Sequence, residues 1–315
     1  MRSPTDERRR KAFILSTTGG IFAVLMWSST IAVARSLTEQ VGPLSSAAGV
    51  YAVGGVAGII RLLISPRRFK QMFTLPKKYL IGCGLLFAAY MLALFLAVGL
   101  ADSRLQVLEV GLLNYLWPAL TIVFSLVLLR HRAHWLLAPG TALGIAGVFL
   151  VLTQGTEVSW ASFMGNLVGN PPSYALGFAA AVLWALYSNL TRRWAGSLGT
   201  GAVELFLPAT GGLLILAAFA APESPVWTPK SIGETVFLGL LTWLGYMLWD
   251  NAMRRGDMML VAAASYFTPL FSTIVIWAYL RVTPEPALWL GCALLVAGSL
   301  LSWASVRERR EGAVG

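Results

Sequence analysis

Residues 105–129 read LQVLEVGLLNYLWPALTIVFSLVLL and carry one charged side chain, Glu109. A helix needs about 20 predominantly apolar residues to cross the hydrocarbon core of a bilayer, and this stretch is long enough. Near its middle, Asn114, Tyr115 and Trp117 precede Pro118. Proline lacks a backbone donor and clashes with the carbonyl four residues back. The stretch therefore predicts a kinked membrane-spanning helix with a polar group, two rings and a freed carbonyl at mid-depth.

The apolar character of this stretch extends over the whole chain. Of 315 residues, 57% are hydrophobic and 12% are charged, and the mean hydropathy is +0.70. Soluble domains carry about 25% charged residues, and disordered chains have low hydrophobicity. The composition excludes disorder and indicates a polytopic membrane protein rather than a soluble enzyme.

We predict ten transmembrane helices joined by short loops, of which 65–78 and 154–171 are the longest. The expected spans are 12–34, 44–64, 79–99, 105–129, 135–153, 172–193, 201–220, 231–253, 259–280 and 287–305.

Lysine and arginine residues decide the expected orientation, because cytoplasmic loops are enriched in them. With a cytoplasmic N-terminus, only four of the 24 basic residues fall outside: Arg35, Arg104, Lys230 and Arg281. We therefore expect a multi-pass protein of a bacterial inner membrane with both termini in the cytoplasm. The net charge of +10 is explained by this asymmetry, and no nucleic-acid partner is expected.

The two halves of the chain contain matching motifs in the same order. At an offset of 157 residues, Trp27 and Arg35 match Trp184 and Arg192. At an offset of 151, the motif Tyr-x-x-Pro at 115–118 recurs at 266–269. At the same offset, GTALGIAG (140–147) matches GCALLVAG (291–298). These matches predict an internal repeat with units 1–153 and 154–315.

Each repeat unit contains five predicted helices, and five is an odd number. The second unit therefore enters the membrane from the opposite side, which relates the units by a two-fold axis in the membrane plane. This arrangement is typical of secondary transporters, which bind substrate near the midplane between the halves. The expected fold is an all-α polytopic membrane protein of ten helices in two inverted five-helix repeats.

Aromatic and neutral polar residues are concentrated at mid-depth of the predicted helices. Such rings either form interfacial belts and packing contacts or bind an amphipathic ligand. Pro118 and Pro269 are the expected helix kinks, although they could serve packing alone. The candidate substrate-binding residues are Trp27, Tyr90, Asn114, Tyr115, Trp117, Trp184, Tyr187, Trp243, Tyr246, Ser265 and Tyr266. In particular, we expect Asn114, Tyr115 and Trp117 to line the cavity from one half, opposite Ser265 and Tyr266.

Four acidic residues, Glu109, Glu204, Glu234 and Asp250, lie near the ends of predicted spans. We expect all four to reach water at the membrane interface. Glu109 and Asp250 are also candidates for coupling or gating, because ionisable groups within membrane helices are often functional. No span carries a carboxylate at mid-depth, which disfavours a proton relay.

The sequence offers no recognisable chemistry of an enzyme. His131 and His134 lie in a short basic loop with no third ligand, and Cys83 and Cys292 each lie in an apolar run. No nucleophile elbow, phosphate-binding glycine loop or zinc motif is present. We therefore predict no catalytic residue, no metal and no cofactor.

The stretches MWSSTIAVARSL (26–37), EVGLLNYLWPALTIVFSLVLLR (109–130) and ASYFTPLFSTIVIWAYL (264–280) resemble the drug/metabolite transporter superfamily and its EamA-type exporters. The likeness covers residues 12–305. It implies a ten-helix basket in which the first, third, fourth, sixth, eighth and ninth helices surround a central cavity. The fifth and tenth helices pack at the periphery. The resemblance also implies aromatic amino acids as substrates.

These observations predict an exporter of small amphipathic solutes that works by alternating access, with amino acids bearing aromatic or hydrophobic side chains as the expected substrates. A monomer is sufficient for this activity. Efflux of drugs or toxic cations is the alternative within transport. A membrane-embedded enzyme or scaffold is the alternative outside it.

Overall fold

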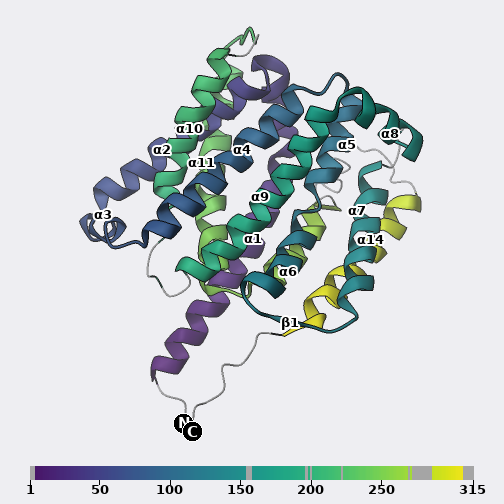
Figure 1. Cartoon of the computed structure of the whole chain (residues 1–315). Coiled ribbons are helices and arrows are strands. Elements are labelled where there is room, and N and C mark those ends of the chain that lie inside the picture. Colours follow the sequence, from purple (N-terminus) through teal and green to yellow (C-terminus); the bar gives the residue numbers. More distant parts are fainter. Residues whose placement is uncertain are drawn as a thin grey trace.

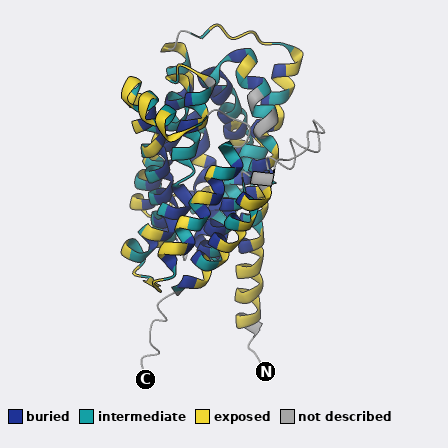
Figure 2. Cartoon of the chain, turned by 90° about the vertical axis from the view of Figure 1, so that its right-hand side faces the viewer, coloured by how far each residue is buried: buried dark blue, intermediate teal, exposed yellow. Residues whose placement is uncertain are grey.

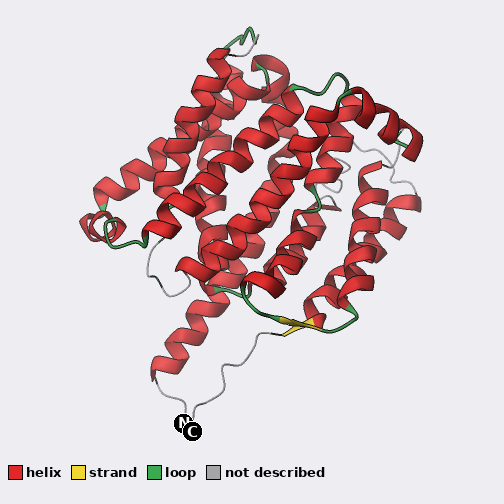
Figure 3. Ribbon diagram, in the orientation of Figure 1, coloured by secondary structure: helices red, strands yellow, loops and turns green. Residues whose placement is uncertain are grey.

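The computed structural model describes residues 4–153, 158–195, 198, 201–220, 223–268, 270–271 and 286–307, which form a bundle of helices (Figures 1 and 3). In chain order the helices are α1 (Pro4–Val41), α2 (Pro43–Ile64), α3 (Pro66–Met72), the π-helical segment η1 (Lys78–Cys83), α4 (Gly84–Gly99), α5 (Arg104–Asn114), α6 (Trp117–Leu128), α7 (Leu137–Thr153), α8 (Trp160–Gly169), α9 (Pro171–Ala195), α10 (Val203–Ala220), α11 (Pro229–Arg255), α12 (Met258–Ala264), the 3₁₀ turn η2 (Ser265–Phe267) and α14 (Pro286–Ser305). Two short strands, β1 (Arg132–Ala133) and β2 (Val306–Arg307), pair antiparallel.

Seven helical segments of the described residues are long and apolar enough to cross a membrane: Asp6–Thr30, Pro43–Ile64, Lys78–Gly99, Leu105–Leu128, Pro171–Ala195, Val203–Ala220 and Pro229–Arg255. Three shorter apolar helices occupy the other three predicted spans, namely Leu137–Thr153, Met258–Phe267 and Trp289–Ser305. A helical multi-pass membrane protein is thereby confirmed. The predicted span 259–280 lies largely outside the described residues beyond residue 271, so the count of ten stays a prediction.

The predicted loop 154–171 contains helix α8. Ser159 and Ser162 form a capping box, in which each hydroxyl accepts a hydrogen bond from the backbone N–H of the other, at 3.1 and 2.9 Å. Such a box satisfies two donors at a helix start. Phe163 of α8 packs against Tyr174 of α9, whereas Trp160 is exposed. The polar residues that we interpreted as a loop therefore begin a helix, which covers one end of the bundle (Figure 1).

Helices that are distant in sequence pack in pairs: α1 with α11, α2 with α10, α4 with α9, and α7 with α14. Buried residues line the interior of the bundle, while the first turns of α1 project beyond it and are exposed (Figure 2). α7 and α14 form a flank of their own in Figure 1.

Glycines allow α7 and α14 to approach closely. A Cβ atom added to Gly298 would lie 2.2 Å from the Gly144 nitrogen. Gly140 faces Leu301, and Gly291 faces Leu150. At the offset of 151 residues, each of the last two contacts maps onto the other, because 140 becomes 291 and 150 becomes 301. Small residues permit such close backbone packing in membrane helices.

The fourth predicted span, 105–129, consists of two helices with a short interruption between them. α5 ends at Asn114 and α6 begins at Trp117, one residue before Pro118. In the second half of the chain, α12 ends at Ala264 and gives way to η2 at 265–267. These interruptions overlap at the offset of 151, because residues 115–116 become 266–267. Pro269 itself lies outside the described residues.

Candidate substrate-binding site

Trp184 of α9 is the centre of a cluster of rings from several helices. Its ring centroid lies 6.1 Å from that of Trp27 on α1, 4.7 Å from that of Tyr90 on α4 and 6.2 Å from that of Trp117 on α6. The ring of Tyr246 on α11 lies 5.7 Å away. Six of the predicted residues are thus brought together, with Tyr187 5.1 Å from Trp184 as the sixth.

We define the aromatic cluster as Trp27, Tyr51, Phe87, Tyr90, Trp117, Trp184, Tyr187, Tyr246 and Trp249. Local sequence explains how the rings converge. Tyr246 and Trp249 are three residues apart on α11, so they lie on one helix face. Gly245 beside them leaves room for the Trp27 indole, whose Nε1 would lie 2.6 Å from an added Cβ. The absence of a side chain at Gly245 of α11 therefore makes room for the Trp27 ring of the neighbouring helix α1.

Three members of the cluster were missed by the sequence interpretation. The Tyr51 hydroxyl lies 2.7 Å from the Tyr246 hydroxyl. The Phe87 ring lies 4.9 Å from the ring of Tyr246, and the Trp249 ring lies 5.4 Å from that of Trp117. Phe87 is three residues before Tyr90 and so lies on the same face of α4. This spacing could have identified Phe87 from the sequence. Tyr51 lies on α2, a helix for which no site residue was predicted.

Two buried polar atoms beside these rings have no hydrogen-bond partner among the described residues. They are Oδ1 of Asn114 and Nε1 of Trp249. Buried polar atoms are usually paired, so an orphaned acceptor and an orphaned donor call for an explanation. Asn114 is one turn before Trp117 and interacts with the Tyr90 hydroxyl. An acceptor and a donor are therefore available next to stacking surfaces.

Tyr115 and Tyr266 make no ring contact with the aromatic cluster among the described residues, although the phenol of Tyr115 is near enough to Tyr90 to interact with it electrostatically. Both pack in a second apolar group against α7 and α14. The Tyr266 ring lies 3.3 Å from the position of an added Cβ on Gly144. Ser265 donates its hydroxyl hydrogen bond, 2.8 Å long, to the Val261 carbonyl of its own helix. The structure thus brings the two predicted tyrosines together, but on the side of the α7–α14 pair.

Trp243 contacts a cation rather than the clustered rings. The Arg61 guanidinium lies 5.8 Å from the centroid of its ring. This distance is within the range of a cation–π interaction. The indole therefore faces α2, whereas Tyr246, three residues later, belongs to the cluster.

The expectation that the carboxylates reach water is wrong for Glu109, Asp250 and Glu204. Glu109 is 0% exposed, Asp250 is 2% exposed and Glu204 is 3% exposed. Position near a helix end suggested exposure, but neighbouring elements cover these ends. Glu204 pairs with Arg61 on α2 at 2.5 Å, while half-buried Glu234 accepts hydrogen bonds from Ser36 and Gln40.

Glu109 is held by neutral donors from two helices. The hydroxyl of Tyr174 on α9 donates to it, as do the Ser162 hydroxyl and the Asn166 amide of α8, each at 3.0 Å. Hydrogen bonds compensate part of the cost of burying a carboxylate. Helix α8 therefore covers Glu109 at its end of the bundle.

Asp250 belongs to a buried ion pair. It accepts hydrogen bonds of 2.7 Å from the Tyr79 hydroxyl and from Nε of Arg254. The same Tyr79 oxygen accepts the backbone N–H of Ala202, and Arg254 also donates to the Leu198 carbonyl. Asp250 thus connects η1, α11 and the segment before α10.

The sequence of this chain matches the model of a known family of membrane proteins. The model of the EamA-like transporter family matches residues 15–153 and 171–304. The chain belongs to this EamA family. The resemblance inferred from three stretches of sequence is therefore confirmed.

Individual members of the EamA family match this chain over almost its whole length. The aromatic amino acid exporter YddG of Escherichia coli is 32% identical over 95% of this chain and 99% of its own. YddG of Salmonella typhimurium is 32% identical over 92% of this chain and 97% of its own. A crystal structure with 31% identity superposes with a TM-score of 0.75 and covers 91% of this chain and 96% of that one.

Proposed function

We propose that this EamA-family protein exports amino acids with aromatic or hydrophobic side chains across a bacterial inner membrane. The observation that carries the proposal is the aromatic cluster around Trp184, with the orphaned atoms of Asn114 and Trp249 beside it. Relatives that share 32% identity are named as aromatic amino acid exporters. The cluster and those names point to the same class of substrate.

The chemistry of a zwitterionic amino acid fits these groups. An apolar or aromatic side chain gains contact area and favourable ring geometry among Trp117, Trp184 and Tyr90. The substrate ammonium can donate to Oδ1 of Asn114, and the substrate carboxylate can accept from Nε1 of Trp249. In this arrangement each orphaned atom gains a partner when substrate binds.

Alternating access between two inverted repeats is the proposed transport mechanism. In inverted repeats, one half rocks against the other around a site at their interface. Three observations support it: the mirrored glycine contacts of α7 and α14, the interruptions at 115–116 and 265–267, and the packing of α1 on α11 and of α4 on α9. The repeat relates the first span (α1) to the sixth (α9) and the third span (α4) to the eighth (α11). The contact of α1 with α11 therefore corresponds to the contact of α9 with α4.

Tyr115 and Tyr266 have a different proposed role from that of Trp117. Both lie at an interruption and pack in the apolar group that includes residues of α7 and α14. We assign them to the movement of the interrupted helices. Trp117 and Asn114 remain assigned to substrate binding.

Efflux of toxic cations is the rival function within transport. A site for organic cations is expected to use an acidic side chain beside its aromatic rings. The aromatic cluster has no acidic member, and Asp250 and Glu204 are each paired with an arginine. This arrangement favours a zwitterion over a cation.

Counterflow by the purified protein in liposomes tests the proposed function. Vesicles are loaded with unlabelled amino acid, and uptake of labelled phenylalanine, tryptophan, leucine and a cationic dye is followed. We expect saturable counterflow of the amino acids and none of the dye. Dye flux without amino acid flux would favour the drug rival, and no flux of any compound would favour an enzyme or scaffold.

A further inference from the structure

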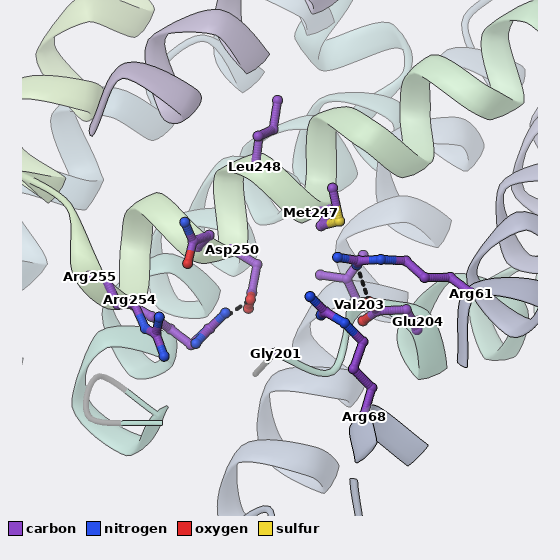
Figure 4. Close-up of a pocket in the computed structure, with 11 residues that line it drawn as sticks. Arg61, Arg68, Gly201, Val203, Glu204, Met247, Leu248, Asp250, Arg254 and Arg255 are labelled. Carbon is purple, nitrogen blue, oxygen red and sulfur yellow. Dashed lines mark hydrogen bonds and ion pairs between the residues drawn. The ribbon is translucent and has the colours of Figure 1, made fainter. Parts of the chain in front are cut away.

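A charged cavity lies at the end of the bundle where α2 and α11 end and α10 begins. A cavity of about 230 Å³ is lined there by charged and polar side chains (Figure 4). Its walls come from α2, α3, α10 and α11. The cavity is separate from the aromatic cluster and has a different chemistry.

The ionisable groups that line this cavity carry a net positive charge. Four arginines face two carboxylates: Arg61, Arg68, Arg254 and Arg255 against Glu204 and Asp250. Because four minus two leaves two, the cavity has a formal charge of +2. Confined charges of one sign attract ligands of the opposite sign.

Three of the four arginines are occupied. Arg61 pairs with Glu204, and Arg254 pairs with Asp250. Arg255 donates from Nε and one terminal nitrogen to the Leu198 carbonyl, at 3.0 and 2.7 Å. Their guanidinium groups are therefore held in place, and they form the fixed wall of the cavity.

Arg68 is different, because among the described residues no hydrogen bond or close ion pair fixes its guanidinium, and its charge acts on Glu204 only from beyond ion-pair distance. Its side chain extends from α3 into the cavity toward Glu204 (Figure 4). Glu204 is already bound to Arg61 at 2.5 Å. The planar fork of a guanidinium matches the two oxygens of a carboxylate. Arg68 is thus placed to bind an anionic group that enters the cavity.

A short chain of contacts connects the cavity to the aromatic cluster. Asp250 in the cavity wall accepts a hydrogen bond from Tyr79, whose ring lies 5.7 Å from that of Phe206. The Phe206 ring lies 6.0 Å from that of Phe87, a member of the cluster. The rings of Tyr79 and Phe206 therefore form a layer between the cavity and the aromatic cluster.

We propose that this cavity is an entry station for the carboxylate group of the substrate, on the side of the membrane that we expect to be cytoplasmic, with Arg68 as its recognition residue. The proposal rests on the proposed export of amino acids and deepens it. The station admits carboxylates, repels cations through its net positive charge, and holds substrate before the ring layer opens. Selection for a carboxylate is made here, and selection for the side chain is made at the aromatic cluster.

Competition by two analogues tests the station. 3-Phenylpropionate keeps the carboxylate of phenylalanine and lacks the ammonium, whereas phenethylamine keeps the ammonium and lacks the carboxylate. Binding of each to the purified full-length protein is measured by calorimetry, and inhibition of phenylalanine counterflow is measured in liposomes. The variants are Arg68→Glu, Arg68→Gln and Arg68→Lys. Arg67→Glu is the matched control, because Arg67 is an exposed neighbour on α3 that does not line the cavity.

We expect Arg68→Glu and Arg68→Gln to weaken 3-phenylpropionate binding at least about tenfold, since a charge-assisted contact is lost. Arg68→Lys should retain only part of the affinity, because the positive charge stays while the planar fork is lost. Phenethylamine binding should not weaken in any of these variants, and Arg67→Glu should match the wild type for both analogues.

Equal 3-phenylpropionate affinity in wild type and Arg68→Glu would overturn the station. A general loss for both analogues would also overturn it, because the effect would then not concern the carboxylate. Absence of phenylalanine counterflow, with 3-phenylpropionate binding still dependent on Arg68, would refute amino acid export while supporting the anion site.

Discussion

The phenol of Tyr79 donates a 2.7 Å hydrogen bond to the Asp250 carboxylate and so joins η1 to α11 in the interior of the protein. Asp250 is at the same time the partner of Arg254, and both side chains are nearly inaccessible. Removing one member of a buried ion pair leaves an uncompensated charge, at a cost of about 3–5 kcal/mol. The pair therefore stabilises this end of the bundle.

The first prediction concerns that pair. Asp250→Asn should lower the thermal unfolding midpoint in detergent, and the double variant Asp250→Asn/Arg254→Gln should recover part of the loss, since it leaves no unpaired charge. The folded fraction of Asp250→Asn should retain partial transport. An unfolding midpoint equal to that of the wild type would show that the carboxylate has no structural role.

The second prediction separates the two groups of rings. Trp117→Ala and Trp184→Ala remove stacking surface from the aromatic cluster, at a cost of about 1–3 kcal/mol in binding. Since about 1.4 kcal/mol is tenfold in affinity, the half-saturation concentration for phenylalanine should rise tenfold or more.

Tyr115→Ala and Tyr266→Ala serve as the comparison, because their rings contact α7 and α14 instead. They should lower the maximal rate of transport with little change in half-saturation. Counterflow kinetics on the four variants decide the matter. Unchanged half-saturation in both tryptophan variants would place the substrate site elsewhere.

The third prediction concerns the contact between α7 and α14. Gly298→Ala would place a methyl group 2.2 Å from the Gly144 nitrogen, so the two backbones must separate. Overpacking of this kind costs about 1–3 kcal/mol. Gly212→Ala is the control, because nothing lies within 4 Å of an added Cβ there. Thermal unfolding should show a loss for the first variant and none for the second; equal curves would mean that the helices adjust freely.

The fourth prediction concerns coupling. The aromatic cluster contains no carboxylate, so transport of a zwitterion should persist when the proton gradient is collapsed. Glu109→Gln should retain at least partial flux, because the amide oxygen can still accept from the donors of α8. Flux is measured with and without an ionophore. Complete loss of transport in folded Glu109→Gln would assign Glu109 to coupling.

The fifth prediction concerns orientation, which follows from the distribution of basic residues. A reporter fused after residue 310 should report the cytoplasm, whereas one inserted within 157–168 should report the outer side. Activity of a periplasmic reporter at the C-terminus would contradict an even number of spans.

Much of the fold could be predicted because apolar segment length and motif order are local properties of a chain. The helix over 105–129 was expected, and an interruption before Pro118 is found where proline excludes a regular helix. Helix α8 was missed, because its capping box uses serines that also occur in loops. The burial of Glu109 was missed for the same reason, since two of its three donors, Ser162 and Asn166, come from α8.

A multi-pass helical membrane protein of the EamA family could be predicted from hydropathy, basic residues and repeated motifs, because these are properties of the chain read in order. Which side chains meet depends instead on how the helices pack. Helix packing gathers Trp27, Trp117 and Trp184 from three helices, and it places Tyr115 in the second apolar group, with Tyr266 and residues of α7 and α14. The same packing joins Arg68 to a charged cavity. The depth of a residue in the membrane follows from its position along the span. The direction of its side chain depends on the rotation of the helix about its own axis, which is set by packing against neighbouring helices.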